Sequence, residues 1–363
     1  MSFTSVLLSA DEPRALLAQC KARLAPQRGQ HNFGVVYLSD HLATDAAGIA
    51  EGLRLITGVE HWVGGVALGV MGSEGEIFDR PAISLLLGTL PQGAFRVFGP
   101  LENLREDPHL AGWCRQHAPY LGLVHADPRR ANAPALIEQL GRDGALYVLG
   151  GLLSSRGAYP QFGVHVGESA VSGALFTDAV PVMTRLTQGC TPIGPRRRVS
   201  AANGMQLLAL DGQPALRALA QDLEADGGGA ADVHVALPRA GSDTGDYLVR
   251  NLMGLGARAE SLVVGQELSV GDTLMFCRRD ARSARRDLDR MLDDIARALK
   301  APPRAGLYVS CLARGPNLFT EPGLETRLIR ERLGEFPLTG FFANGEVAGG
   351  RLYGYTGVLT LLL

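Results

Sequence analysis

The sequence lacks the features that mark several large classes of protein. It has no excess of one charge, since 35 Lys and Arg face 37 Asp and Glu and the formal net charge is −2. This balance argues against a general attraction to nucleic acid or to an anionic membrane. No apolar run reaches the roughly 20 residues that cross a bilayer, and the N-terminal segment lacks the basic start of a secretory signal. We therefore expect a soluble cytoplasmic protein with neither nucleic acid nor a membrane as its partner.

Paired cysteines and the common cofactor motifs are also missing. The five cysteines are odd in number and scattered, so we expect free thiols in a reducing compartment. No motif for covalent haem attachment, phosphate binding, a zinc protease or a serine hydrolase occurs. His109, Cys114 and His117 lie close together, but they lack a fourth ligand. We predict no metal and no cofactor, while noncovalent haem on His165 or His234 stays open.

Glycine is abundant, with 46 of the 363 residues. Most of these glycines interrupt apolar runs, where glycine marks a bulge, a bend or a close approach of two backbones. A chain of this length exceeds one ordinary core, so two domains are expected. We place the boundary near residue 200, which gives an N-terminal domain over 1–200 and a C-terminal domain over 201–363.

One pattern occurs three times along the chain: a strand with a polar end, a helix, and a second strand broken by glycine. The three copies cover residues 33–69, 121–155 and 305–346. A strand, a helix and a strand in this order predict a parallel pair joined by a crossover. Segments 82–90, 163–177 and 351–363 are predicted to pair antiparallel with them. The predicted fold is α/β (mixed α+β), with layered mixed sheets, outer helices and repeated strand-helix-strand units in two associated domains.

The third copy combines the residue types that bind small molecules. Arginine presents a planar fork that suits a carboxylate or phosphate, and glutamate suits an amine or hydroxyl. Such side chains at the ends of strands favour a small-molecule site. The predicted ligand-binding residues are Cys311, Arg314, Gly315, Phe341, Asn344 and Glu346. Accessory candidates in other polar segments are Gln188, Cys190, Arg278 and Arg279.

Cys311 and the Arg314–Glu346 pair each leave alternatives open. Cys311 is a buried small residue, a thiol in a binding site or a nucleophile, and no histidine follows it in the sequence. Arg314 and Glu346 either bind a ligand or pair with each other or with the backbone. Adjacent strand residues face opposite ways, so of Phe341 and Phe342 one enters the core and the other lines the site. We assign no catalytic residue and favour binding over catalysis.

Several motifs resemble the FIST family, in an order that covers nearly the whole chain. VVYLSD, GVEHWVGGVALG, TQGCTPIGPRRRVSAANG and LALDGQPAL are similar to the N-terminal FIST domain. YLVRNLMGL, MFCRRDARSARRDL, SCLARGPNLF, PLTGFFANGEVAG and LYGYTGVLTLL are similar to the C-terminal FIST domain. The first unit has GGVALG where typical members carry a more polar pattern, so we expect the site in the C-terminal unit.

The resemblance implies an intracellular sensory protein that binds a small polar ligand, such as an amino acid or a related metabolite. Because the FIST pattern fills the chain, the signal is expected to pass to a separate partner, such as a histidine kinase or a cyclic-di-GMP signalling protein. Some bacterial members of the family bind haem and sense nitric oxide, which gives a first alternative. An enzyme that uses the Cys311 thiol is the second.

Overall fold

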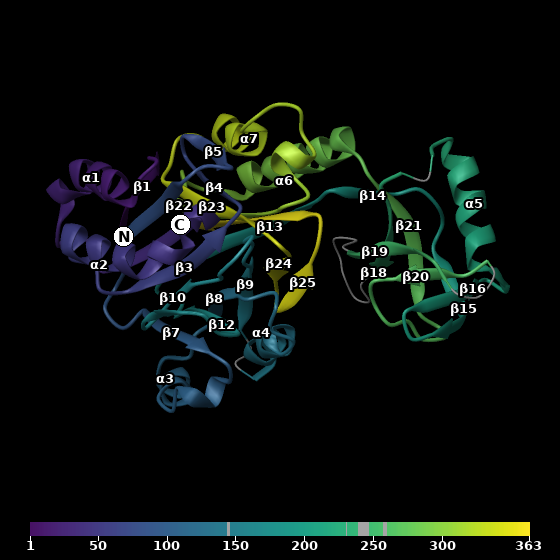
Figure 1. Cartoon of the computed structure of the whole chain (residues 1–363), viewed down its shortest axis with the longest axis horizontal. Helices are drawn as coiled ribbons and strands as arrows, with labels where there is room; N and C mark the ends of the chain where they lie inside the picture. Colours follow the sequence, from purple (N-terminus) through teal and green to yellow (C-terminus); the bar gives the residue numbers. More distant parts are fainter. Residues whose placement is uncertain (144–145, 230, 239–246, 257–259) are drawn as a thin grey trace. The chain divides into compact units, whose positions relative to one another are not determined.

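The computed structural model describes residues 1–143, 146–229, 231–238, 247–256 and 260–363 (Figure 1). The chain groups into two compact units. The first unit consists of Met1–Thr187, Asp289–Leu352 and Thr356–Leu363, and the second of Gln188–Leu288 and Tyr353–Tyr355. The second unit is thus an insertion within the first along the chain. The domain boundary that the sequence predicts near residue 200 stays a prediction.

Three repeats, which make up most of the first unit, have the same order of elements: strand, helix, strand, helix, strand, hairpin, strand. The first repeat is β1 (Ser2–Ser9), α1 (Pro13–Leu24), β2 (Phe33–Ser39), α2 (Ala46–Thr57), β3 (Trp62–Ala67), β4 (Gly69–Gly72), β5 (Gly75–Phe78) and β6 (Ala82–Thr89). The second is β7 (Phe95–Leu101), α3 (Leu110–His117), β8 (Leu121–Ala126), α4 (Ala133–Asp143), β9 (Tyr147–Leu152), β10 (Gln161–Phe162), β11 (Val166–Gly167) and β12 (Val171–Phe176). The third is β13 (Val182–Gln188), α6 (Ala281–Ala298), β22 (Ala305–Cys311), α7 (Leu324–Leu333), β23 (Leu338–Ala343), β24 (Glu346–Ala348), β25 (Arg351–Tyr353) and β26 (Thr356–Leu362).

Each repeat builds one sheet but gives its hairpin to another. The parallel pairs are β2–β3, β8–β9 and β22–β23, and β6, β12 and β26 lie antiparallel to the first strand of each pair. Hairpin β4–β5 joins β23, β10–β11 joins β3, and β24–β25 joins β9. The predicted crossovers and their antiparallel partners are confirmed. The cyclic exchange of hairpins binds the three repeats into one unit.

The recurring glycines have a steric cause. Gly64, Gly150 and Gly340 hold equivalent positions on the second strand of each parallel pair. A Cβ on them would lie 1.8, 1.9 and 2.0 Å from a carbonyl oxygen of the neighbouring strand. Gly64 and Gly150 also have φ values of +141° and +128°, which side chains rarely adopt. Only glycine fits these three crossings, so the predicted close approach of backbones explains the repeated pattern.

The helices cover the outer faces of the sheets, as predicted, while the inner faces share one apolar core (Figure 1). On the first sheet, α1 and α2 bury Leu16, Ile49 and Leu53 against the strands. Helix α2 ends at Gly58, whose φ of +75° provides the usual left-handed C-terminal turn. In the central core, the Tyr37 hydroxyl lies 3.0 Å from Nε2 of His125. Burial lowers the pKa of His125 to about 3, so this ring is neutral and structural.

The second unit is a closed barrel with one covering helix. Its elements are β14 (Cys190–Pro192), β15 (Arg197–Asn203), β16 (Gln206–Leu210), β17 (Gln213–Pro214), α5 (Ala215–Asp226), β18 (Val233–Pro238), β19 (Tyr247–Leu255), β20 (Leu262–Val264) and β21 (Thr273–Arg279). The sheet runs β21-β15-β16-β20-β19-β18, and β18 pairs with β21 to close the ring. Leu219 of α5 packs into the same core as Val235 and Phe276.

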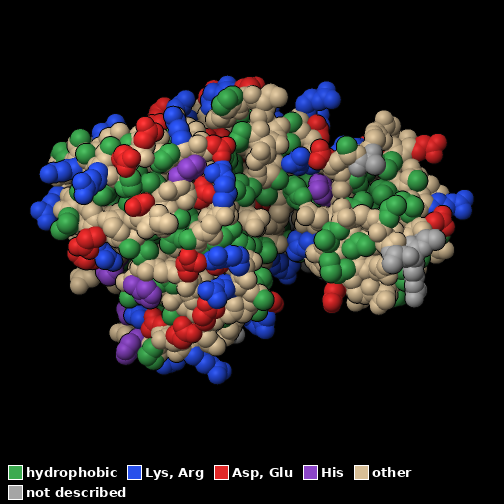
Figure 2. Space-filling view, in the orientation of Figure 1, with side chains coloured by type: hydrophobic (Ala, Val, Ile, Leu, Met, Phe, Trp, Pro, Cys, Tyr) green, Lys and Arg blue, Asp and Glu red, His purple; other side chains and the backbone are tan. Residues whose placement is uncertain are grey.

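The surface and the helices agree with the absence of a charge excess or a long apolar run. Figure 2 shows basic and acidic side chains interspersed over the face in view. Within the residues that the structure describes, no helix is both long and apolar enough to cross a membrane.

Candidate functional site

The ends of the first parallel strands carry one polar or thiol side chain in each repeat. Ser39, Asp127 and Cys311 hold equivalent positions. Each lies three residues after the strand residue that pairs with Gly64, Gly150 or Gly340 on the neighbouring parallel strand. Ser39 Oγ accepts a hydrogen bond from the Ala82 N–H at 2.9 Å. Asp127 accepts several from Arg129, at 2.7–3.1 Å. These two side chains therefore stabilise the local chain. Cys311 holds the third position.

Beyond Cys311, Arg314 is completely buried and pairs with Glu325, a residue that the sequence did not single out. The Nε and Nη2 atoms of Arg314 lie 2.9 and 2.8 Å from Oε1 of Glu325. Glu325 also accepts hydrogen bonds from the hydroxyls of Tyr308 and Ser310 and from the Gly315 N–H, at 2.7, 3.0 and 3.1 Å. Burial lowers the pKa of Arg314, but the charge and hydrogen bond of Glu325 together with Tyr308 and Cys311 outweigh this effect, so the pKa is raised. Arg314 is therefore a permanent cation.

The sequence predicted that Arg314 binds a ligand or pairs with Glu346 or with the backbone. In the structure, its guanidinium pairs with Glu325 through Nε and Nη2. The Nη1 and Nη2 atoms of Arg314 are nevertheless buried without a hydrogen-bond partner among the described residues, although Nη2 forms the ion pair with Glu325. Glu325 lies in the first turn of α7, where an acid is a common helix-start signal. The sequence therefore marked its place on the helix but not its partner.

The Glu346 side chain is also completely buried. Its Oε2 atom accepts hydrogen bonds from the N–H and hydroxyl of Thr356, at 3.0 and 2.6 Å. Its Oε1 atom has no hydrogen-bond partner among the described residues. Burial raises the pKa of Glu346 to about 8, although Thr356, Cys311 and Arg314 each oppose the shift. The carboxyl is thus mostly protonated at neutral pH.

Cys311 connects the two buried side chains. Its thiol is 8% exposed and interacts with the Glu346 carboxyl and with the charge of Arg314. The structure therefore brings together Cys311, Arg314 and Glu346, and we call these three residues together with Glu325 the strand-end cluster. Glu76 of β5 lies next to Glu325, and burial together with the Glu325 charge raises the pKa of Glu76 to about 7. The sequence offered no signal for Glu76, because it enters from another repeat through the hairpin exchange.

The remaining predicted residues lie around the cluster or away from it. Gly315 has a φ of +51°, and a Cβ there would lie 2.5 Å from the ring of Phe342. Phe341 points to the other face, where its ring centroid lies 4.6 Å from that of Tyr37 in the central core. Asn344 is exposed, and its N–H donates to the Leu152 carbonyl at 2.9 Å. Of the two phenylalanines, Phe342 is the one next to Gly315.

The four accessory residues belong to the second unit, or begin it. Strands β14 and β21 place Cys190 opposite Arg279. Arg278 binds Asp226 at 2.9 Å and the carbonyls of Gly229 and Ala231, and Arg279 binds Asp232 at 3.0 Å. The Gln188 side chain donates to the Tyr247 carbonyl at 2.9 Å. These contacts stabilise the barrel, and a binding role for the four residues stays a prediction.

The two histidines considered for haem differ in their surroundings. His165 is exposed in the turn between β10 and β11. The His234 ring lies 4.4 Å from the ring of Tyr355, and its two nitrogens have no hydrogen-bond partner among the described residues. Burial lowers the pKa of His234, which favours the neutral ring that a metal ligand requires. Haem binding to either histidine stays a prediction.

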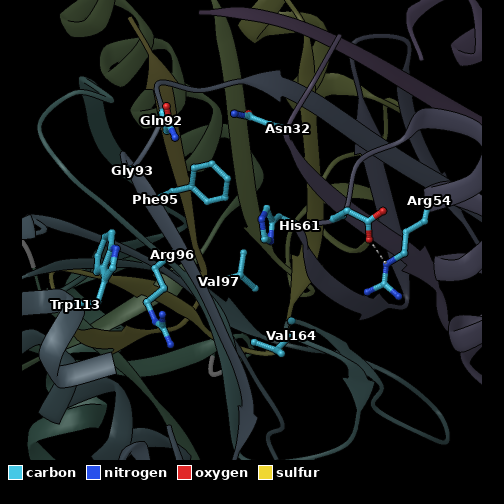
Figure 3. Close-up of a pocket in the computed structure, with 12 residues that line it drawn as sticks. Asn32, Arg54, His61, Gln92, Gly93, Phe95, Arg96, Val97, Trp113 and Val164 are labelled. Atoms are coloured by element: carbon cyan, nitrogen blue, oxygen red, sulfur yellow. Dashed lines mark ion pairs between the residues drawn. The ribbon is translucent and has the colours of Figure 1, made fainter. Parts of the chain in front are cut away.

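A hollow of about 670 Å³ lies elsewhere in the first unit, between the first and second repeats (Figure 3). Its walls come from six separate segments of the chain, so no single sequence motif could predict it. The lining residues are Asn32, Arg54, Glu60, His61, Gln92, Gly93, Phe95, Arg96, Val97, Trp113, Gly163 and Val164. We call this the inter-repeat hollow.

Comparison with known proteins agrees with the resemblance of the motifs to the FIST family. The FIST N domain matches residues 32–213 and the FIST C domain residues 215–349. The uncharacterized protein Rv0628c of Mycobacterium tuberculosis is 30% identical over 331 residues, which cover 83% of each chain. The uncharacterized protein Mb0898c of Mycobacterium bovis is 30% identical over 327 residues, which cover 83% of this chain and 82% of the relative. FIST domains are associated with sensing in signal transduction. The chain belongs to the FIST family.

Proposed function

We propose that this protein is a sensor that binds a small polar, anionic ligand at the strand-end cluster and signals to a separate partner. The observation that carries the proposal is that buried polar atoms of Arg314 and Glu346, among them Nη1 and Oε1, have no hydrogen-bond partner among the described residues. A buried polar group that lacks a hydrogen bond costs about 1–3 kcal/mol. A ligand that satisfies both atoms would recover this free energy.

The protonation of the cluster selects the ligand chemistry. Arg314 is a cation, and Glu346, with a pKa of about 8, carries a proton at neutral pH. Both therefore offer hydrogen-bond donors, and a carboxylate that accepts from both is the best match. The sequence suggested that glutamate would bind an amine or a hydroxyl, whereas the burial of Glu346 favours an acid. Amino acids and small organic acids carry such a carboxylate.

The sealed position of the cluster supports a role in sensing rather than in storage. Arg314 and Glu346 are 0% exposed, so a ligand enters only when neighbouring side chains or segments move. Binding is then coupled to a change of conformation, which is the property that a sensor needs. A histidine kinase or a cyclic-di-GMP signalling protein is the proposed recipient of this change.

Thermal unfolding of the full-length protein with single amino acids and small carboxylic acids tests the proposal. A ligand that binds the folded state at a hundred times its Kd stabilises it by about 2.7 kcal/mol. We expect at least one acid to raise the Tm of the wild type above its value without ligand. The same acid should cause no such rise in Glu346→Leu. Glu335→Gln is the matched control, because this side chain is 79% exposed. A panel without any effect, or an equal rise in Glu346→Leu, would refute the proposed site.

A further inference from the structure

We propose that the inter-repeat hollow is a second binding site, specific for a small aromatic carboxylate. It shares no residue with the strand-end cluster, and its ligand chemistry follows from its own walls. A volume of about 670 Å³ falls within the range of roughly 300–1,000 Å³ that is typical of small-molecule sites.

The centre of the hollow is aromatic. The rings of His61 and Phe95 meet edge to face, with centroids 5.5 Å apart (Figure 3). Trp113 forms a further wall, and its ring stacks on His117 at 4.8 Å with an angle of 9° between the planes. This stack fixes the indole in place. A planar ring of a ligand therefore meets rigid aromatic surfaces, which favour offset or edge-to-face contacts.

Two arginines supply the polar part of the site. Both oxygens of Asp107 accept from Nη2 of Arg96 at 2.9 Å, and this pair fixes the guanidinium beside the hollow. Arg54 lies on the other side, with its Nε atom 4.0 Å from Glu60. The Glu60 side chain is 74% exposed, against 30% for Arg54 and 28% for Arg96. The acid is thus at the solvent-exposed rim and the cations lie deeper, an arrangement that favours a carboxylate on the ligand.

The equivalent junction between the third and first repeats is closed. Phe336 corresponds to Glu60, because each lies four residues before the equivalent glycine, Gly340 or Gly64. The pairing of the hairpins with these strands makes Ser73 equivalent to Val164. The registers of β1 and β7 make Ser5 equivalent to Val97. Ser73 Oγ lies 3.1 Å from Ser5 Oγ, donates to the Phe336 carbonyl at 3.0 Å, and accepts from the Leu338 N–H at 3.0 Å. Only about 10 Å³ is left there. Valines replace both serines at the hollow, so this hydrogen-bonded closure cannot form.

At the junction between the second and third repeats, the hairpin turn makes different contacts. Gly349 corresponds to Val164 and Tyr147 to His61, and a Cβ on Gly349 would lie 3.6 Å from the Tyr147 ring. The Gly350 N–H donates to the Val148 carbonyl at 3.1 Å, so the hairpin turn packs directly on the sheet and on α4. Among the described residues, the other two junctions thus carry contacts different from those of the open hollow, which is lined by aromatic and cationic side chains. The side chains that line the hollow are therefore specific to this junction and do not follow from the repeated fold alone.

Isothermal titration of the full-length protein with indole-3-acetate and benzoate tests this site, with indole-3-acetamide and benzamide as neutral controls. We expect at least one acid to bind ten-fold or more tightly than its amide. Val164→Trp, which fills the hollow from an exposed turn, should abolish the binding, and His61→Ala should weaken it several-fold. Leu55→Trp is the matched control, because Leu55 is as exposed as Val164 but does not line the hollow.

The outcomes separate this site from the strand-end cluster. Glu346→Gln should bind the aromatic acid like the wild type, and Val164→Trp should keep the stabilisation by the ligand of the cluster. If neither acid binds, if the amides bind equally well, or if folded Val164→Trp binds like the wild type, the proposal is wrong. Loss of aromatic acid binding in Glu346→Gln would assign it to the strand-end cluster instead.

Discussion

The strand-end cluster and the inter-repeat hollow are built in opposite ways within one unit. The cluster is sealed, with Arg314, Glu325 and Glu346 at 0% exposure, and its members lie within one repeat. The hollow is open, and its walls come from two repeats and an exchanged hairpin. Charge in the cluster is therefore dominated by burial, whereas charge in the hollow is screened by water. The same kinds of residue should then respond very differently to substitution.

The largest difference is expected when the cluster loses its central acid. Glu325→Gln leaves Arg314 as a buried cation without a counter-charge, and breaking a buried pair in this way costs about 3–5 kcal/mol. Urea unfolding should show this loss in the first unit. Glu331→Gln, a half-exposed acid on the same helix, should change the free energy of unfolding by less than about 0.5 kcal/mol. Similar values for the two variants would show that the cluster is not sealed.

The next difference is expected in how the free energy of unfolding depends on pH, through Glu346 of the cluster. Burial raises the folded-state pKa of Glu346 from 4.5 to about 8, so the folded protein holds a proton that the unfolded chain releases. Its contribution to stability is fully present below pH 4.5 and is lost as pH rises through about 8. The loss is on the order of 5 kcal/mol, because the pKa changes by about 3.5 and one pKa unit corresponds to about 1.4 kcal/mol.

Urea unfolding of the wild type and of Glu346→Gln between pH 5 and 8 measures this contribution. The variant should lack the decline that the Glu346 proton causes, and the exposed-site control Glu335→Gln should retain it. An unchanged slope in Glu346→Gln would mean that this carboxyl is ionised in the folded protein, and would remove the argument for an acidic ligand.

A smaller effect is expected when an ion pair beside the hollow is weakened. Asp107→Asn removes the charge that holds Arg96, and a partly exposed pair of this kind contributes about 1 kcal/mol or less. The free energy of unfolding should fall by no more than this amount, while binding of an aromatic acid becomes weaker because the guanidinium is no longer fixed. Asp178→Asn, at an exposed position, serves as the control. A loss of 3 kcal/mol or more would place the hollow in the same energetic class as the cluster.

The fold was predictable as far as its pattern is local in sequence. The polar strand ends and the glycine breaks identified the three strand-helix-strand units, because alternation of strand and helix is visible in each segment by itself. The exchange of hairpins was not predictable, because strands as short as β4 and β10 pair according to the geometry of another repeat. That exchange also carries Glu76 to the third repeat.

The candidate site follows the same rule. Cys311, Arg314 and Glu346 lie in or next to one conspicuous motif pair, and the structure brings them together. Glu325 was missed because a helix-start acid is common and its partner depends on how α7 packs. The inter-repeat hollow was missed altogether, because its six segments meet only after the three sheets have assembled.

Native mass spectrometry of the full-length protein tests the central claim most directly, namely that the strand-end cluster binds a small acid. The protein is incubated with the amino acids and small carboxylic acids of the thermal panel and sprayed from a volatile buffer near pH 7. We predict one bound acid per chain in the wild type and in Val164→Trp, and none in Glu346→Leu. An adduct that persists in folded Glu346→Leu, or no adduct with any acid, would contradict the account.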